Sequence, residues 1–285
     1  MHDETVHDEI VMEYAWHLVA RIGLNTKVPD EYGYKLPLHL LSAQAFYNVN
    51  SWSDVAMLLR ELPRQMAEHA LMRSDGGNQW IPLHFAAVNA PRYIISLMLS
   101  LAPDAARVKT PNGCLPLHNA ASRNNIDILE LLVNAYPEGV LDKDRYGRTP
   151  LHNAARMAPS SIINLMLSTV PYAASVKDCN GCLPLHFATA AVRLQKVDDI
   201  KLLVNAYPEA ILEKNIDGKT PLHMVIGNGH IKFSHLDFVK LYVGACPKAI
   251  FATANDGKNP IHFLSLDDII QVLQLVEWSY QALEL

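Results

Sequence analysis

A Pro-Leu-His tripeptide recurs along almost the whole of this 285-residue chain, and it constrains the fold more than any other feature. Six full copies and a seventh, Pro-Ile-His, place their histidines at His39, His84, His118, His152, His186, His223 and His262. Successive histidines are 45, 34, 34, 34, 37 and 39 residues apart, so the centre keeps a strict period. A fixed period of this size is typical of stacked units that bury their apolar faces only against their neighbours. The sequence therefore predicts a repeat array and argues against most single-core enzyme folds.

One period predicts a helix, a turn and a second helix. Around His118, Asn112-Gly113 marks a turn, and Pro116 suits the first position of a short helix with a narrow apolar face. Asn124-Asn125 interrupt that helix, and apolar residues then recur at helical spacing from residue 126 to residue 133. Tyr136-Pro137 end the second helix, since proline has no amide hydrogen to donate.

These motifs resemble the ankyrin repeat, whose signature includes Thr-Pro-Leu-His-x-Ala at a period of 33. The segments that match it best are Gly147-Arg148-Thr149-Pro150-Leu151-His152-Asn153-Ala154-Ala155 and Gly218-Lys219-Thr220-Pro221-Leu222-His223. The resemblance covers about residues 34–285. It implies an all-α repeat solenoid, an ankyrin-type helix-turn-helix stack with short β-hairpin connectors. We expect an N-terminal capping helix and connector over residues 1–33, six repeats over 34–255 and a C-terminal capping repeat over 256–285.

Two departures from the ankyrin pattern are regular. Proline stands where the ankyrin consensus ends its second helix with glycine, and each of these prolines lies 15 residues before the next motif histidine: Pro103, Pro137, Pro171, Pro208 and Pro247. Leucine or isoleucine replaces the motif threonine in four repeats, which removes a possible helix cap of about 1 kcal/mol. We expect these replacements to pack between neighbouring repeats: Leu36, Ile81, Leu115 and Leu183. The variable lengths fall between histidine and proline, which predicts insertions within or between the two helices.

A longer duplication and two capping segments complete the organisation. The sequence from Leu97 to His118 reappears 68 residues later, which indicates that two repeats were copied as a pair. Residues 5–22 predict an amphipathic helix whose apolar face comprises Val6, Ile10, Tyr14, Leu18 and Ile22. Residues 73–79 predict a long hairpin or loop. Asp267 to Leu283 predicts a final helix through Ile269, Ile270, Leu273, Val276 and Trp278.

The motif histidines could be metal ligands or structural anchors. Adjacent helix pairs would place them about 10 Å apart, far beyond shared coordination of one ion, where zinc to nitrogen is about 2.0–2.1 Å. We therefore predict that all seven are structural and that each imidazole bonds groups of the hairpin at the first helical turn.

Other candidate chemistry has weak support. Cys179 and Cys182 form a C-x-x-C, which can be a redox pair or half a zinc site, but it stands alone at a predicted hairpin tip. Asp198-Asp199 and Asp267-Asp268 precede second helices, where the helix dipole favours negative charge. The sequence has no phosphate loop, nucleophile elbow or H-E-x-x-H motif. We therefore expect no enzyme, no cofactor and no metal, although a deep pocket with convergent polar groups would restore an enzymatic hypothesis.

Composition narrows the partners. A formal net charge of −5 without a basic block argues against nucleic acid. The acidic first residues are unlike a secretory signal, no apolar run approaches the length of a membrane span, and four cysteines do not make a disulfide scaffold. We expect a cytoplasmic or nuclear protein that is not secreted and is monomeric on its own.

The resemblance implies a protein-interaction module that binds a partner through the concave face of hairpin tips and first helices. An architectural or targeting role in a larger assembly is the alternative. Carried over by position, the candidate partner-binding residues are Asn112, Asn119, Arg123, Arg145, Tyr146, Arg148, Asn153, Arg156, Met157, Asn180 and Phe187. Tyr146, Arg148, Arg156 and Met157 form the best candidate hot spot, because tyrosine, arginine and methionine are enriched in interface cores. Phe187 could instead pack against a neighbouring helix.

Overall fold

The computed structural model describes residues 13–21, 37–46, 52–74, 79–123, 125–190, 197–227, 236–264, 269–274 and 276–277. Internal contacts divide the chain into two compact units, Met1–Arg145 and Tyr146–Leu285. The boundary falls in the hairpin that precedes the helix of His152.

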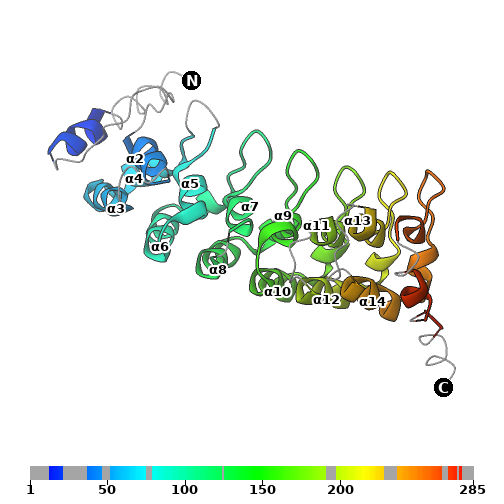
Figure 1. Cartoon of the computed structure of the whole chain (residues 1–285). Helices are drawn as coiled ribbons and strands as arrows, with labels where there is room; N and C mark the ends of the chain where they lie inside the picture. The colour runs from blue at the N-terminus through cyan, green and yellow to red at the C-terminus, as the bar shows by residue number, and fades with distance from the viewer. Residues whose placement is uncertain are drawn as a thin grey trace. The chain divides into compact units, whose positions relative to one another are not determined.

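The first unit is built from helix pairs joined by turns (Figure 1). Its described elements are a helix over 13–21, α2 (Pro37–Phe46), α3 (Trp52–Glu61), α4 (Arg64–Met72), α5 (Pro82–Asn89), α6 (Arg92–Leu101), the 3₁₀ helix η2 (Pro103–Arg107), α7 (Pro116–Ala121), α8 (Ile126–Ala135) and η3 (Pro137–Leu141).

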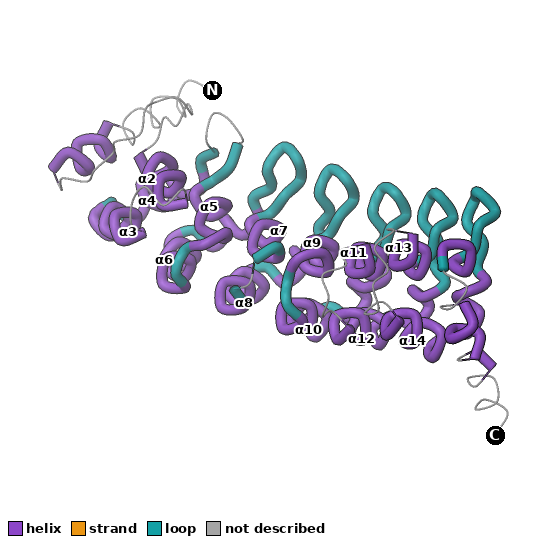
Figure 2. Tube along the Cα trace, viewed as in Figure 1, coloured by secondary structure: helices purple, strands orange, loops and turns teal. Residues whose placement is uncertain are grey.

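The second unit repeats this order. Its described elements are α9 (Pro150–Met157), α10 (Ser160–Thr169), η4 (Pro171–Ser175), α11 (Pro184–Ala190), α12 (Val197–Ala206), η5 (Pro208–Ile211), α13 (Pro221–Gly227), α14 (Leu236–Ala245), η7 (Pro247–Phe251), η8 (Pro260–Phe263) and helical residues 269–274 and 276–277. The described residues of both units contain no strand, and the connectors are loops (Figure 2).

Within each unit, like helices pack on like helices. The first helix of each pair, here called the inner helix, contacts the next inner helix, as α5 contacts α2 and α7 and as α11 contacts α9 and α13. The outer helices form a second row, with α6 on α8 and α10 on α12 (Figure 1). The inner helices present small buried side chains such as Ala120 and Ala154, which lets neighbours approach closely. The apolar replacements Ile81, Leu115 and Leu183 are fully buried, as predicted; Leu36 lies outside the described residues.

The prolines end the outer helices, as predicted. In α8 the last helical residue is Ala135, and Pro137 begins η3 two residues later. The connector thus opens with a 3₁₀ turn rather than with the extended chain that the sequence favoured. The first repeat differs, because Pro63 is followed by the full helix α4. That extra helix accounts for most of the longer spacing between His39 and His84, which sequence analysis left unresolved.

The capping helices differ from their predicted faces. Helix 13–21 buries Ala15, Leu18 and Val19, whereas Tyr14, predicted to face the core, is 39% exposed. The buried stripe therefore lies one position from the predicted one. Val6, Ile10 and Ile22 lie outside the described residues, as do residues 75–78 of the predicted loop and the insertions at 191–196 and 228–235.

The C-terminal helix also differs from its prediction. Val272 and Val276 are buried, whereas Ile270 and Leu273 are 56% and 42% exposed. Trp278 lies outside the described residues.

The predicted duplication of a repeat pair recurs in the polar contacts. Lys109 lies 2.7 Å from Asp142 in the first unit, and Lys177 lies 2.6 Å from Glu213 in the second. Tyr207 donates its hydroxyl hydrogen to Glu213 at 3.3 Å. The Lys177 ammonium lowers the pKa of the Glu213 carboxyl. The copied pair therefore retained an ion pair between its two members.

Candidate functional site

The hairpin loops form a ladder of backbone hydrogen bonds within each unit. In the first, the Arg145 amide donates to the Asn112 carbonyl at 2.7 Å. In the second, Cys179 donates to Tyr146 and Ile216 donates to Asn180, each at 2.9 Å. These bonds fix the positions of the loop tips that the sequence predicts to contact a partner.

Each motif histidine whose contacts are described bonds at its own helix start. The imidazole Nδ1 accepts from the backbone amide three residues earlier, at 3.1 Å for Leu115 to His118 and for Thr149 to His152. The threonine hydroxyl adds a contact to Nδ1 at 2.9 Å in His152. Leucine at this position loses only that contact, because the imidazole provides the acceptor in both cases. The side chain of His39 lies outside the described residues.

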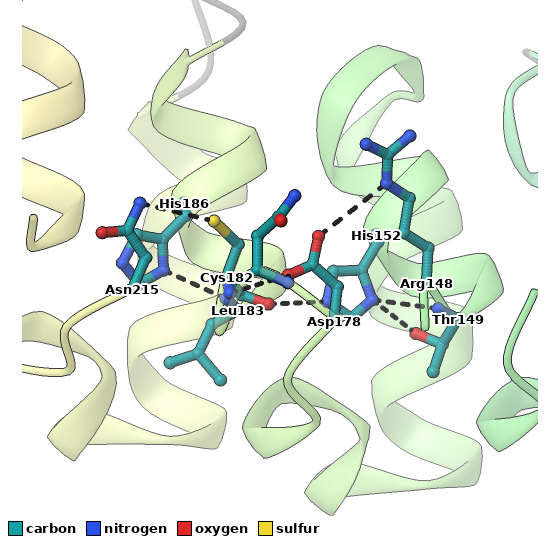
Figure 3. A network of polar contacts seen from close by, with 9 residues as sticks. Arg148, Thr149, His152, Asp178, Cys182, Leu183, His186 and Asn215 are labelled. Atoms are coloured by element: carbon teal, nitrogen blue, oxygen red, sulfur yellow. Dashed lines mark hydrogen bonds and ion pairs between the residues drawn. The ribbon is translucent and has the colours of Figure 1, made fainter. Parts of the chain in front are cut away.

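The second imidazole nitrogen reaches the next repeat. Nε2 of His84 lies 3.1 Å from the Cys114 carbonyl oxygen, and Nε2 of His186 lies 3.2 Å from that of Lys219. Because Nδ1 accepts, Nε2 carries the hydrogen and donates it. Burial lowers the pKa of His84 and of His186 from 6.5 to about 4, so both rings are neutral at physiological pH. The histidines thus connect hairpin, helix and following repeat (Figure 3).

Three candidate residues come together in the second unit, and we call them the aromatic–arginine group: Tyr146, Arg148 and Phe187. The Arg148 guanidinium carbon lies 5.1 Å from the ring centroids of both Tyr146 and Phe187. The edge of Phe187 meets the His152 ring at 5.3 Å and 88°. Tyr146 is 46% exposed, and Phe187 is half-buried. The group is therefore an ordered cation–π cluster at the surface.

Asp178 supports this group, and sequence analysis did not single it out. Its buried carboxylate lies 3.8 Å from Nε of Arg148 (Figure 3). The other carboxylate oxygen accepts from the amides of Asn180 and Cys182, both at 2.8 Å. Asn215 makes the same two bonds in the next hairpin. An Asx residue two positions before Asn180 in the turn was the available signal.

The other predicted residues of the second unit lie elsewhere. Arg156 and Met157 end α9, about 12 Å along the helix axis from Arg148 at 1.5 Å per residue. Both are exposed, Met157 by 58%. Asn153 is half-buried in α9, and Asn180 is exposed at its hairpin tip. The four-residue hot spot therefore consists of two separate pairs.

The candidates of the first unit are partly used in structural bonds. The Asn119 side chain donates to the His84 carbonyl at 3.1 Å, which connects α7 to α5. Arg145 donates to the side-chain oxygen of Asn112 at 2.8 Å, and both residues are exposed. Arg123 is exposed after α7.

The cysteines and carboxylates are placed for structure. Cys179 and Cys182 are free thiols, and burial raises the pKa of Cys182, which disfavours a reactive thiolate. Asp198 and Asp199 lie in the first turn of α12, where Asp199 is buried and accepts from the Ser160 hydroxyl at 2.5 Å. Asp267-Asp268 lie outside the described residues.

Within the described ranges, no group of three or more histidine, cysteine or acidic side chains is close enough to hold a metal ion. In the same ranges, none of the helices has the length and apolar character needed to cross a membrane.

Comparison with known proteins identifies the architecture. Residues 83–176 match a family model described as ankyrin repeats, in three copies. Among solved structures, the chain is similar to the ankyrin repeat domain of Bcl-3, whose title calls it a unique member of the IkappaB protein family, with a TM-score of 0.62 and 19% identity. The alignment covers 84% of this chain and 97% of that domain. A search of curated proteins finds no match.

Proposed function

Because this chain is an ankyrin-repeat protein in its fold and in its central repeats, we propose that it is a non-enzymatic module that binds a protein partner through its hairpin tips and inner helices. We place the principal contact on the second unit. A rigid surface of this kind is ordered before binding, which lowers the entropic cost of association. The neutral, buried histidines and the hairpin ladder supply that rigidity.

The aromatic–arginine group is the observation that carries this proposal. Arginine and tyrosine are the residue types that most often dominate binding energy. Here the Arg148 side chain lies between two aromatic rings and beside a buried carboxylate, so little side-chain entropy is lost when a partner covers it. Arg156 and Met157 offer a second contact at the far end of α9.

Quantitative affinity purification with mass spectrometry tests the proposal. The full chain is compared with the double variant Tyr146→Ala/Arg156→Ala, which removes one exposed side chain from each pair. We expect partners bound through this face to be recovered at a tenth of the level or less. Tyr172→Ala is the matched control, because Tyr172 is 61% exposed in η4, outside the hairpins and inner helices. Equal recovery with both variants, at unchanged thermal stability, would reject this face as the binding surface.

An architectural role in a larger assembly is the second candidate. It is favoured by exposed apolar side chains in the connectors, where Leu212 and Phe251 are 43% and 45% exposed at the same position, four residues after Pro208 and Pro247. Leu212→Asp/Phe251→Asp distinguishes the two roles, since it would release a permanent assembly and leave capture through Tyr146 unchanged. We place the protein in the cytoplasm or nucleus, which its free cysteines favour.

A further inference from the structure

The last repeat of the second unit keeps positions that, in earlier repeats, contact the repeat that follows. Three kinds of contact connect one repeat to the next: a hairpin carbonyl, the motif histidine and an apolar residue of the outer helix. The corresponding residues of the last repeat are Asp256, His262 and Leu273.

The hairpin contact is lacking after the last repeat. In the second unit, the residue before each hairpin glycine accepts a bond from the next hairpin, as Asp217 accepts from Asn255 at 3.0 Å. A Cβ atom on Gly218 would lie 2.6 Å from the Asn255 nitrogen, whereas one on Gly257 would meet nothing within 4 Å. Within the described residues, the Asp256 carbonyl has no such donor.

The histidine shows the same difference. Nε2 of His223 lies 3.3 Å from the Lys258 carbonyl oxygen, and His223 is buried. His262 makes the usual Nδ1 bond to the Asn259 amide at 3.2 Å, but its ring is exposed. Among the described residues no carbonyl lies within hydrogen-bond distance of its Nε2.

The outer helix shows it most clearly. Val272 and Val276 are buried, as Ile162 and Met166 are at the same positions of α10, so this helix is packed in its normal place. Leu273 is nevertheless 42% exposed, whereas its counterpart Ile163 is fully buried beside α12. A terminal repeat requires a polar outer face for solubility, and leucine at this position does not provide one.

We propose that this C-terminal face, formed by Asp256, Gly257, His262, Ile270 and Leu273, binds the same face of a second copy of the chain about a two-fold axis. The face continues the repeat-to-repeat interface, and its apolar centre of Ile270 and Leu273 complements itself. Its edge carries both signs, with Lys258 beside Asp256 and with Glu277 exposed on the same helix as Leu273.

Charge and symmetry favour a second copy as the occupant. A two-fold axis can bring Lys258 of one copy toward Asp256 or Glu277 of the other. A two-fold contact also closes after two copies, whereas a head-to-tail contact would continue into a filament. This dimer would replace the monomer expected from the sequence. It uses a different surface from the proposed partner site and does not depend on it.

Sedimentation velocity over a micromolar concentration range tests the proposal on the full chain. We expect a reversible monomer–dimer equilibrium whose dissociation constant rises at least tenfold in Leu273→Glu. Met157→Glu is the matched control, since it places the same charge at a 58% exposed site on α9 and leaves the dimer intact. Both positions are exposed, so circular dichroism should show unchanged folding.

Disulfide trapping tests the symmetry. In a Cys179→Ser background, Leu273→Cys is oxidised with oxidised glutathione, and a residue near a two-fold axis forms a covalent dimer with itself. A monomer at every concentration overturns the proposal, as does a dimer that Leu273→Glu leaves unchanged. A dimer lost in Leu273→Glu but not trapped by Leu273→Cys would show a head-to-tail contact, which also overturns it.

Discussion

Nε2 of His152 lies 3.1 Å from the carbonyl oxygen of Cys182, a residue that belongs to the next hairpin. The same ring accepts from the Thr149 amide at 3.1 Å through Nδ1. One buried side chain therefore satisfies backbone groups of two successive repeats, and both bonds require the neutral ring with its hydrogen on Nε2.

Replacement of this histidine should destabilise the fold. In His152→Ala, the Thr149 amide and the Cys182 carbonyl both lose their partner in a buried site. Each unsatisfied group costs about 1–3 kcal/mol, so we expect the free energy of unfolding to fall by about 2–5 kcal/mol. Urea denaturation followed by circular dichroism measures this loss. His262→Ala is the matched control, because its exposed ring makes only the first of the two bonds. Equal effects of the two variants would contradict a role for the bond between repeats.

Stability should decrease as the solution is acidified from pH 6.5 toward pH 4. Burial lowers the pKa of His84 and His186 from 6.5 to about 4 in the folded protein, so the unfolded chain binds more protons in this range. The contribution of each ring is complete above pH 6.5 and declines by up to about 1.4 kcal/mol per pH unit below it. Urea midpoints between pH 7.5 and pH 5 measure the slope. His84→Gln should reduce the slope, and a midpoint independent of pH over this range would exclude neutral buried histidines.

Sequence periodicity predicted most of the fold and only part of the candidate site. The tripeptide and the prolines set the helix boundaries because each acts locally, through capping at His118 or through the missing amide of Pro137. The faces of the end helices were predicted wrongly, since Tyr14 and Leu273 have helical spacing but face no neighbouring repeat. The grouping of Arg148 with Phe187 joins residues of two repeats, which a pattern within one repeat does not reveal.

The bond between Ser160 and Asp199 should contribute measurably to packing between α10 and α12. The serine hydroxyl donates at 2.5 Å to a buried carboxylate, and Ser160→Ala removes this donor. We expect a loss of about 1–3 kcal/mol in the free energy of unfolding. Ser168→Ala, in which an exposed hydroxyl loses its bond to the Leu165 carbonyl, should change stability by less than about 0.5 kcal/mol. A neutral Ser160→Ala variant would show that this bond makes no net contribution.

The hairpin glycines should differ in their tolerance of alanine according to what lies beside them. Gly147 and Gly257 both have a positive φ, 74° and 76°, so alanine pays a backbone cost of about 1–2 kcal/mol at either position. At Gly147 the added Cβ would also lie 2.7 Å from the Cys179 nitrogen, which donates to the Tyr146 carbonyl. Gly147→Ala should therefore separate two hairpins and lose clearly more stability than Gly257→Ala, measured by thermal melting at low protein concentration. Because φ is nearly the same at both positions, the difference isolates the contact between hairpins. Equal losses would show that adjacent hairpins do not hold each other in place.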